Sequence, residues 1–150
     1  MKRFLLACAF LSSGAALGAG GGTNVAPIDP AFDRANQAAL RGDWAAAQAT
    51  MKDALARDPN SADYHNMYAY TLRKGPNPDM GLVFKHYNEA LRIEPKHRGA
   101  NEYLGEAYLM VGNLPKAKEQ LAALDKICVL SCREYTELKS SIAAYEAKKK

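Results

Sequence analysis

The chain has 150 residues, of which 48% are hydrophobic and 24% charged, and its formal net charge is +4 at pH 7. Lys2, Arg3 and the lysines at positions 148–150 supply this excess of positive charge, so the body of the chain is close to neutral. A near-neutral body excludes the basic surface that binding to nucleic-acid phosphates requires. The length suits a single domain.

The first 22 residues have the layout of a secretory signal peptide. Lys2 and Arg3 precede an apolar run over positions 4–11, and small residues follow up to position 22. The run is shorter than the roughly 20 residues of a membrane-spanning helix, so we expect cleavage rather than anchoring. We expect no lipid at Cys8, because only four apolar residues precede it. Residues 23–30 are interpreted as a linker.

Helix-forming residues dominate the remainder, and the ends of the expected helices are marked by Gly, Pro and capping residues. Gly42 and Gly75 are placed to end helices, Pro59 to stop one, and Ser61 and Asn77 to cap the helices that follow. The pattern predicts seven helices, over about residues 31–41, 44–57, 62–74, 78–93, 96–111, 114–127 and 133–148. Strand signals are nearly absent, so an all-α fold is predicted.

The helices follow a pattern that recurs about every 34 residues, as helix, Gly turn and helix. Gly42-Asp43-Trp44 forms the turn of the first copy and Gly112-Asn113-Leu114 that of the third. The middle copy repeats the spacing of Tyr, Ala and Pro residues through Tyr87, Ala90 and Pro95. A fixed period of this kind indicates stacked helical hairpins, each of which buries its apolar face only against its neighbours.

The pattern resembles the tetratricopeptide repeat. The third copy matches that family best, at Leu104, Gly105, Tyr108, Gly112, Ala117 and Leu121. The resemblance implies a right-handed superhelix of about three hairpins within residues 31–147, with repeats over about 28–61, 62–97 and 98–131 and a capping helix over 133–147. The chain departs from the family where Val129 replaces the expected Pro, and where about two extra residues lengthen the turn around positions 75–79.

The resemblance also implies which side chains face the concave groove. Carried over by position, the candidate partner-binding residues are Asn36, Asp63, Asn66, Tyr70, Arg73, Glu102, Glu106 and Met110. Some members of the family clamp a terminal carboxylate in this groove, but Glu102 and Glu106 stand where such a clamp needs positive charge. The groove therefore favours a polar or basic segment with an apolar anchor. The alternative is that these residues form an ordinary solvated face.

Cys128 and Cys132 flank the loop before the last helix. In an exported protein this pair predicts a disulfide if residues 129–131 form a turn. Its expected role is to fix the angle of the capping helix. A redox-active pair, a metal site and free thiols remain alternatives, although the spacing is one residue longer than Cys-x-x-Cys and no His lies nearby in the sequence.

No phosphate loop, nucleophile elbow or carboxylate pair signals chemistry, and the three histidines lack ligand spacing. We therefore expect no enzyme activity, no cofactor and no metal. The sequence predicts a non-catalytic protein–protein interaction module of the bacterial cell envelope, periplasmic or secreted, that holds a peptide or protein partner in its groove. We expect no nucleic-acid partner and no membrane contact beyond the signal peptide. The alternative is a thiol redox or metal-handling periplasmic protein that uses Cys128 and Cys132.

Overall fold

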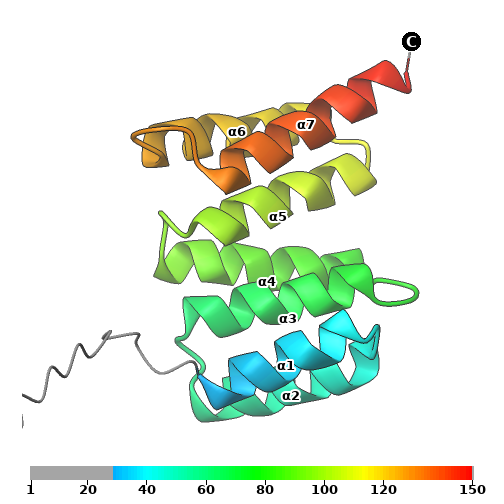
Figure 1. The fold of residues 1–150 in the computed structure, drawn as a ribbon, viewed down its shortest axis with the longest axis vertical. Helices are drawn as coiled ribbons and strands as arrows, with labels where there is room; N and C mark the ends of the chain where they lie inside the picture. The colour runs from blue at the N-terminus through cyan, green and yellow to red at the C-terminus, as the bar shows by residue number, and fades with distance from the viewer. Residues whose placement is uncertain (1–28, 150) are drawn as a thin grey trace, which may run out of the picture.

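The structure, a computed structural model, describes residues 29–149, and the expected signal peptide lies outside this range. The described residues form seven α-helices and no strand: α1 (Pro30–Leu40), α2 (Trp44–Arg57), α3 (Ala62–Lys74), α4 (Met80–Ile93), α5 (Arg98–Met110), α6 (Leu114–Ile127) and α7 (Arg133–Ala147). The hairpins α1–α2, α3–α4 and α5–α6 are stacked in chain order along the long axis, and α7 follows at the end of the stack (Figure 1).

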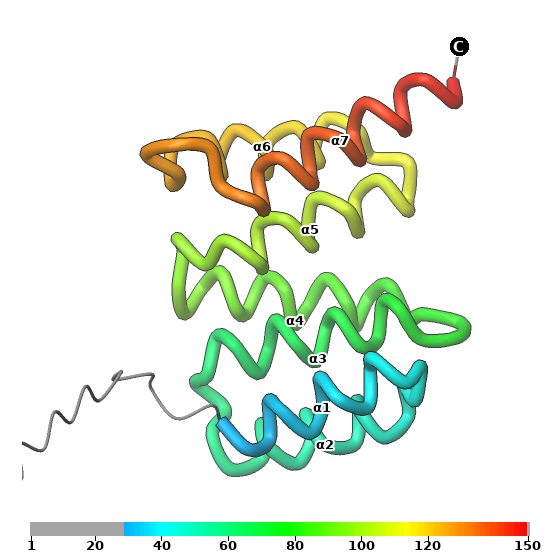
Figure 2. The backbone as a smooth tube through the Cα atoms, in the orientation of Figure 1, coloured from blue at the N-terminus to red at the C-terminus, as the bar shows by residue number. Residues whose placement is uncertain are grey.

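The odd-numbered helices form one layer of the stack. Each of α1, α3, α5 and α7 contacts the next of them, whereas α2, α4 and α6 do not contact one another. The tube in Figure 2 shows the same arrangement, with the connection between α3 and α4 looping out from one side. We call the surface formed by α1, α3, α5 and α7 the inner face. Three of the four helices of this face begin a repeat, as the sequence predicts for the groove.

Gly turns and polar caps explain where the hairpins bend. Gly42 and Gly112 adopt positive φ angles of 75° and 78°, which residues with a Cβ rarely adopt. The side chains of Asp43 and Asn113, which follow these glycines, accept hydrogen bonds from the first turns of α2 and α6. Ser61 caps α3 by accepting from the amide of Tyr64, as predicted. The two Gly turns therefore set the same hairpin geometry in the first and third copies.

Two predicted helix starts are wrong by two residues. We predicted that α4 begins at Pro78 under an Asn77 cap, but Asn77 has a φ of 55° and the cap is Asp79, which accepts from the amide of Leu82. We predicted that α5 begins at position 96, but the ring of His97 accepts from the amide of Ala100 and caps a helix that starts at Arg98. In both cases a later acceptor replaces the residue that the sequence favoured.

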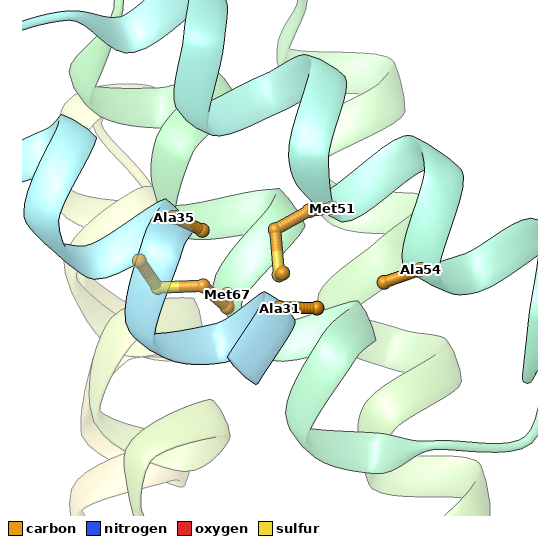
Figure 3. Packing of buried hydrophobic residues seen from close by; sticks show 5 residues of the cluster. All are labelled: Ala31, Ala35, Met51, Ala54 and Met67. Atoms are coloured by element: carbon orange, nitrogen blue, oxygen red, sulfur yellow. The ribbon is translucent and has the colours of Figure 1, made fainter. Parts of the chain in front are cut away.

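The core runs through the stack as small clusters that neighbouring hairpins share. Met51 of α2 and Met67 of α3 pack with three alanines at the first of these contacts (Figure 3). Tyr87 of α4 and Leu104 of α5 form the next one. Leu138 of α7 is buried in the last, together with residues of α6 and α7. Because each cluster draws on two hairpins, or on one hairpin and α7, the single hairpins have no core of their own.

The described helices include none that is both long and apolar enough to cross a lipid bilayer.

Candidate binding site

The inner face is hollowed by a cavity of about 660 Å³ that lies between its four helices. Its residues come from α1, α3, α5 and α7 and from the connection between α4 and α5. They are Phe32, Asn36, Asp63, Asn66, Met67, Tyr70, Glu94, Lys96, His97, Arg98, Gly99, Tyr103, Arg133 and Glu134. Aromatic and amide side chains thus share one cavity with charged residues of both signs.

The structure brings four of the eight candidate partner-binding residues into this cavity: Asn36, Asp63, Asn66 and Tyr70. The other four lie elsewhere. Arg73 and Glu106 belong to an ionic cluster at the side of the cavity, and Glu102 is buried between α5 and α7; both are described below. Met110 is the last residue of α5, where its side chain is exposed and does not line the cavity.

Asn66 is the polar residue most deeply set in the cavity wall. Only 8% of its surface is exposed, and its Oδ1 has no hydrogen-bond partner among the described residues. Its amide nitrogen packs over the first turn of α5, where a Cβ atom on Gly99 would lie 3.2 Å from Nδ2. Glycine at this position therefore makes room for the carboxamide. A buried acceptor without a partner is costly, which makes Asn66 a strong candidate for contact with a ligand.

A hydrogen bond and an ion pair link neighbouring repeats around the cavity. His97 Nε2 lies 3.0 Å from Asp63 Oδ1, and this hydrogen bond lowers the pKa of Asp63. Arg98 Nε lies 4.0 Å from Glu134 Oε1, which is too long for a hydrogen bond. These contacts join α3 to α5 and α5 to α7, so they hold the cavity walls in register.

Sequence reasoning missed the part of the cavity that α7 and the start of α5 provide. We predicted α7 only as a cap, yet Arg133 and Glu134 in its first turn line the cavity. His97, Arg98 and Tyr103 were also missed, because the positions carried over from the family in the third repeat were Glu102, Glu106 and Met110. The period of the repeat could have found Arg133 and Glu134, since α7 continues the series of odd-numbered helices.

Arg73 forms the centre of the ionic cluster beside the cavity. Its guanidinium lies 2.8 Å from Glu106 Oε2, and its Nε donates to the hydroxyl of Tyr87 at 3.2 Å. The guanidinium also lies over the rings of Tyr70 and Tyr103, 5.8 and 5.5 Å from their centroids. Burial raises the pKa of Tyr103 to about 12. The charge of Arg73 is thus used within the fold rather than offered to a partner.

Glu102 is a buried carboxyl group between α5 and α7. Only 1% of its surface is exposed, and its Oε2 has no hydrogen-bond partner among the described residues. Burial, helped by the neighbouring carboxyl groups of Glu137 and Glu106, raises the pKa of Glu102 to about 8. The raised pKa favours the protonated form of Glu102 and so makes the inner face less acidic than its composition suggests.

Cys128 and Cys132 are joined by a disulfide, with their Cα atoms 5.8 Å apart. The bridge closes the loop between α6 and α7, one residue before the cavity residue Arg133. The described residues include no group of three or more His, Cys, Asp or Glu side chains placed to hold a metal ion. The structural role of this disulfide stays a prediction, with a redox-active role as the alternative.

No protein-family profile matches the sequence, and comparison with curated proteins gives no match. Comparison with solved structures gives several. The TPR2B domain of yeast Sti1, in its complex with pHsp70, has a TM-score of 0.70 at 18% identity, over 79% of this chain and 94% of that domain. The chaperone SycD of Yersinia enterocolitica, in complex with a peptide of YopD, has a TM-score of 0.66 at 15% identity, over 80% and 92% of the two chains.

The first TPR domain of human RPAP3 has a TM-score of 0.64 at 14% identity, over 78% of this chain and 93% of that one. Sequence identities of this size show only that the folds are alike. The chain has the fold of a tetratricopeptide-repeat domain, with its helical hairpins stacked in an all-α superhelix.

Proposed function

We propose that this chain is a non-catalytic protein–protein interaction module, which binds a peptide segment of its partner in the cavity of the inner face. The observation that carries the proposal is a cavity in which the carboxamide residues Asn36 and Asn66 occur together with the aromatic residues Tyr70 and Tyr103. A carboxamide presents a donor and an acceptor side by side, and a peptide group offers the complementary pair.

The surroundings of Asn66 fit an extended segment. Phe32, Met67 and Tyr70 supply apolar contacts, and Asn36 supplies a second carboxamide on α1. The hydrogen bond between His97 and Asp63 fixes one wall. A site that is formed before binding loses little conformational entropy when a peptide enters it. The structural neighbours SycD and RPAP3 also occur with peptides, a YopD peptide and an HSP90 peptide, which supports the same use of this fold.

Site-specific photo-crosslinking tests the location of the site. A photoreactive amino acid replaces Asn36, which is exposed and lines the cavity. The matched control carries the same amino acid at Lys52, an exposed position on α2 outside the cavity. We expect crosslinked peptide from the partner at position 36 and little at position 52. Equal crosslinking at the two positions would contradict binding in the cavity.

We further propose that the partner is a component of the bacterial cell envelope and that the mature chain is periplasmic or secreted. The support is the export-signal layout of residues 1–22. Amino-terminal sequencing of the protein from an osmotic-shock fraction tests this part. A mature chain that begins between positions 19 and 23 supports export, whereas an intact Met1 in a cytoplasmic fraction contradicts it.

A further inference from the structure

We propose that residues 23–28, which precede α1, occupy the cavity of the inner face in the mature chain, so that a partner peptide must displace them. The structure describes the chain from Asp29 onward, and these six residues lie outside the described range. The proposal rests on the proposed function, because it describes how binding at the same site is regulated. The occupancy of the cavity can nevertheless be measured on the chain alone.

The cavity lies at one end of the inner face, where the amino termini of its helices gather. Each of α1, α3, α5 and α7 contributes residues to the cavity only from its first nine positions. These four helices begin on the same side of the stack (Figure 1). The residues that precede α1 therefore join the described chain at the end of the stack that holds the cavity.

Asp29 fixes the point at which the segment joins this end. Its Oδ1 accepts hydrogen bonds from the amides of Ala31 and Phe32, and its Oδ2 accepts from the hydroxyl of Tyr64 at 2.6 Å. Phe32 lines the cavity, and so does Asp63, the residue before Tyr64. The chain therefore enters α1 beside two residues of the cavity wall, and hydrogen bonds hold it there between α1 and α3.

Six residues are long enough to cross the cavity. An extended chain covers about 3.3 Å per residue, so residues 23–28 can reach about 20 Å from Asp29. Packed helices lie about 8–10 Å apart, so this length extends from α1 across α3 to α5, where Tyr103 lines the cavity. A mature chain that begins between positions 19 and 23, as proposed above, keeps all six residues. Pro27 disfavours a helical conformation at Ala26, which suits the segment to extended binding.

The charges of the cavity suit a segment without charge. Three acidic and three basic side chains line the cavity: Asp63, Glu94, Glu134, Lys96, Arg98 and Arg133. Residues 23–28, which read Thr-Asn-Val-Ala-Pro-Ile, are uncharged. The segment can therefore enter the cavity without placing a charge next to one of the same sign, which would oppose binding.

The apolar residues of the segment match the aromatic wall of the cavity. The segment contains Val25, Pro27 and Ile28. The rings of Tyr70 and Tyr103 both line the cavity, and their centroids lie 5.1 Å apart, so α3 and α5 together offer one aromatic surface. Moving aliphatic side chains from water onto such a surface is favourable, and this transfer drives the proposed contact.

Attachment to α1 strengthens a contact that would be weak for a free peptide. A ligand on a short flexible tether has an effective concentration in the millimolar range. Residues 23–28 are joined directly to Asp29, so the segment fills the cavity even with a modest intrinsic affinity. A partner peptide then binds only the molecules whose cavity is open, and its apparent affinity falls by that fraction.

Photo-crosslinking of the purified mature chain alone tests the occupancy. A photoreactive amino acid replaces Asn36 in the cavity, and the control carries it at the exposed Lys52 on α2. We expect mass spectrometry to find residues 23–28 crosslinked to position 36 and not to position 52. A mixture of isotope-labelled and unlabelled chains shows whether the crosslink forms within one chain. Equal crosslinking at the two positions, no crosslink to the segment, or a crosslink between chains would each overturn the proposal.

The double variant Val25→Ser/Ile28→Ser tests the apolar contact, because it removes two aliphatic side chains without adding charge. The matched control Val129→Ser/Leu130→Ser makes the same kind of change at side chains that are 97% and 85% exposed and do not line the cavity. We expect the crosslink at position 36 to weaken strongly in the first variant and to persist in the second. Circular dichroism confirms that each variant is folded. An undiminished crosslink in Val25→Ser/Ile28→Ser would contradict the proposed contact.

Affinity for a partner separates this proposal from the proposed function. The probe is a partner peptide that crosslinks at position 36. If the segment fills the cavity in about nine of ten molecules, Val25→Ser/Ile28→Ser should raise the apparent affinity about tenfold, whereas Val129→Ser/Leu130→Ser should leave it unchanged. Unchanged affinity in the first variant would overturn the competition and leave the proposed function in place. If the segment crosslinks in the chain alone but no partner peptide does, the proposed function fails and the occupancy by the segment stands.

Discussion

Gly105 lets α5 and α7 approach each other closely. A Cβ atom on Gly105 would lie 2.6 Å from Cδ2 and 2.7 Å from Cδ1 of Leu138, which is fully buried. We expect Gly105→Ala to lower the free energy of unfolding by about 1–3 kcal/mol, because the clash outweighs the better helix propensity of alanine. Urea denaturation followed by circular dichroism measures this change.

The double variant Gly105→Ala/Leu138→Ala tests the cause. Leu138→Ala alone should cost about 2–5 kcal/mol through the cavity that it leaves. In the double variant the new methyl group enters that space. The double variant should therefore lose less free energy of unfolding than the two single variants lose together. Strict additivity would show that Leu138 is not what the methyl group meets.

His65 and His86 form a hydrogen-bonded pair between α3 and α4. Their Nδ1 atoms lie 2.8 Å apart, and His65 Nε2 lies 3.0 Å from the carbonyl oxygen of Pro59. A carbonyl only accepts, so His65 donates from Nε2 and its Nδ1 accepts from the Nδ1–H of His86. Burial, together with the neighbouring His65, lowers the pKa of His86 to about 4. The folded state therefore resists adding a proton at this position.

This pair predicts a loss of stability on acidification. His86 takes up a proton near pH 6.5 when unfolded and near pH 4 when folded, so its contribution is complete above pH 6.5 and declines as the pH falls toward 4. We expect a decline of about 1–2 kcal/mol, less than the full difference in pKa implies because His86 is only partly buried. Urea titrations between pH 7 and pH 4 measure it. A His86→Gln variant with the same decline would contradict this origin.

At the scale of the helices, the sequence predicts the first and last residues of a helix correctly where a local cap determines them. Both α2 and α6 have the predicted bounds, because a polar cap follows a Gly with positive φ in each case. The starts of α4 and α5 were missed, because Asn77 takes a left-handed conformation and a histidine ring serves as a cap. Neither choice follows from helix propensity. The first depends on the path of the turn inside the second hairpin, and the second on the connection between the second and third hairpins.

The candidate site was predictable only in part for a related reason. The repeat register placed Asn66 and Tyr70 in the cavity, because their positions follow from the helical period alone. It did not show that Arg73 pairs with Glu106, since such pairing depends on how far apart two repeats lie. It also gave no sign that Met110 lies outside the cavity.

The disulfide lies directly before the start of α7. It closes a short loop whose cysteines are four residues apart, and such loops contribute about 2 kcal/mol by restricting the unfolded chain. We expect Cys128→Ser/Cys132→Ser to lower the free energy of unfolding by about this amount and to speed hydrogen exchange in the first turn of α7. Exchange in α1 serves as the internal control and should not change.

Equilibration in glutathione buffers separates a structural role of the disulfide from a redox role. A bridge that resists reduction supports the staple. A bridge that is reduced at the glutathione potential of an oxidising compartment would favour the thiol-redox alternative instead.

At the scale of the whole molecule, Arg73 joins three helices of neighbouring repeats. It extends from α3, bonds Tyr87 on α4 and pairs with Glu106 on α5, which in turn accepts from Ser141 on α7. Arg73→Ala leaves a partly buried carboxylate without its cation, so we expect a loss of about 3 kcal/mol in the free energy of unfolding. Thermal and urea denaturation both report it.

Removing the stranded charge should rescue part of that loss. The double variant Arg73→Ala/Glu106→Gln is expected to be more stable than Arg73→Ala alone, because glutamine needs no cation. If the two variants unfold at the same urea concentration, Arg73 stabilises the stack by packing rather than by pairing with Glu106.

The use of the inner face by a partner is tested most directly by NMR spectroscopy of the full chain, titrated with a partner peptide that crosslinks at position 36. The account predicts shifts of the side-chain amide of Asn66 and of the backbone amides of Gly99 and Tyr103, which line the cavity. Exposed positions on α2, α4 and α6 should keep their signals. Shifts confined to those outer helices, with Asn66 unmoved, would contradict the account.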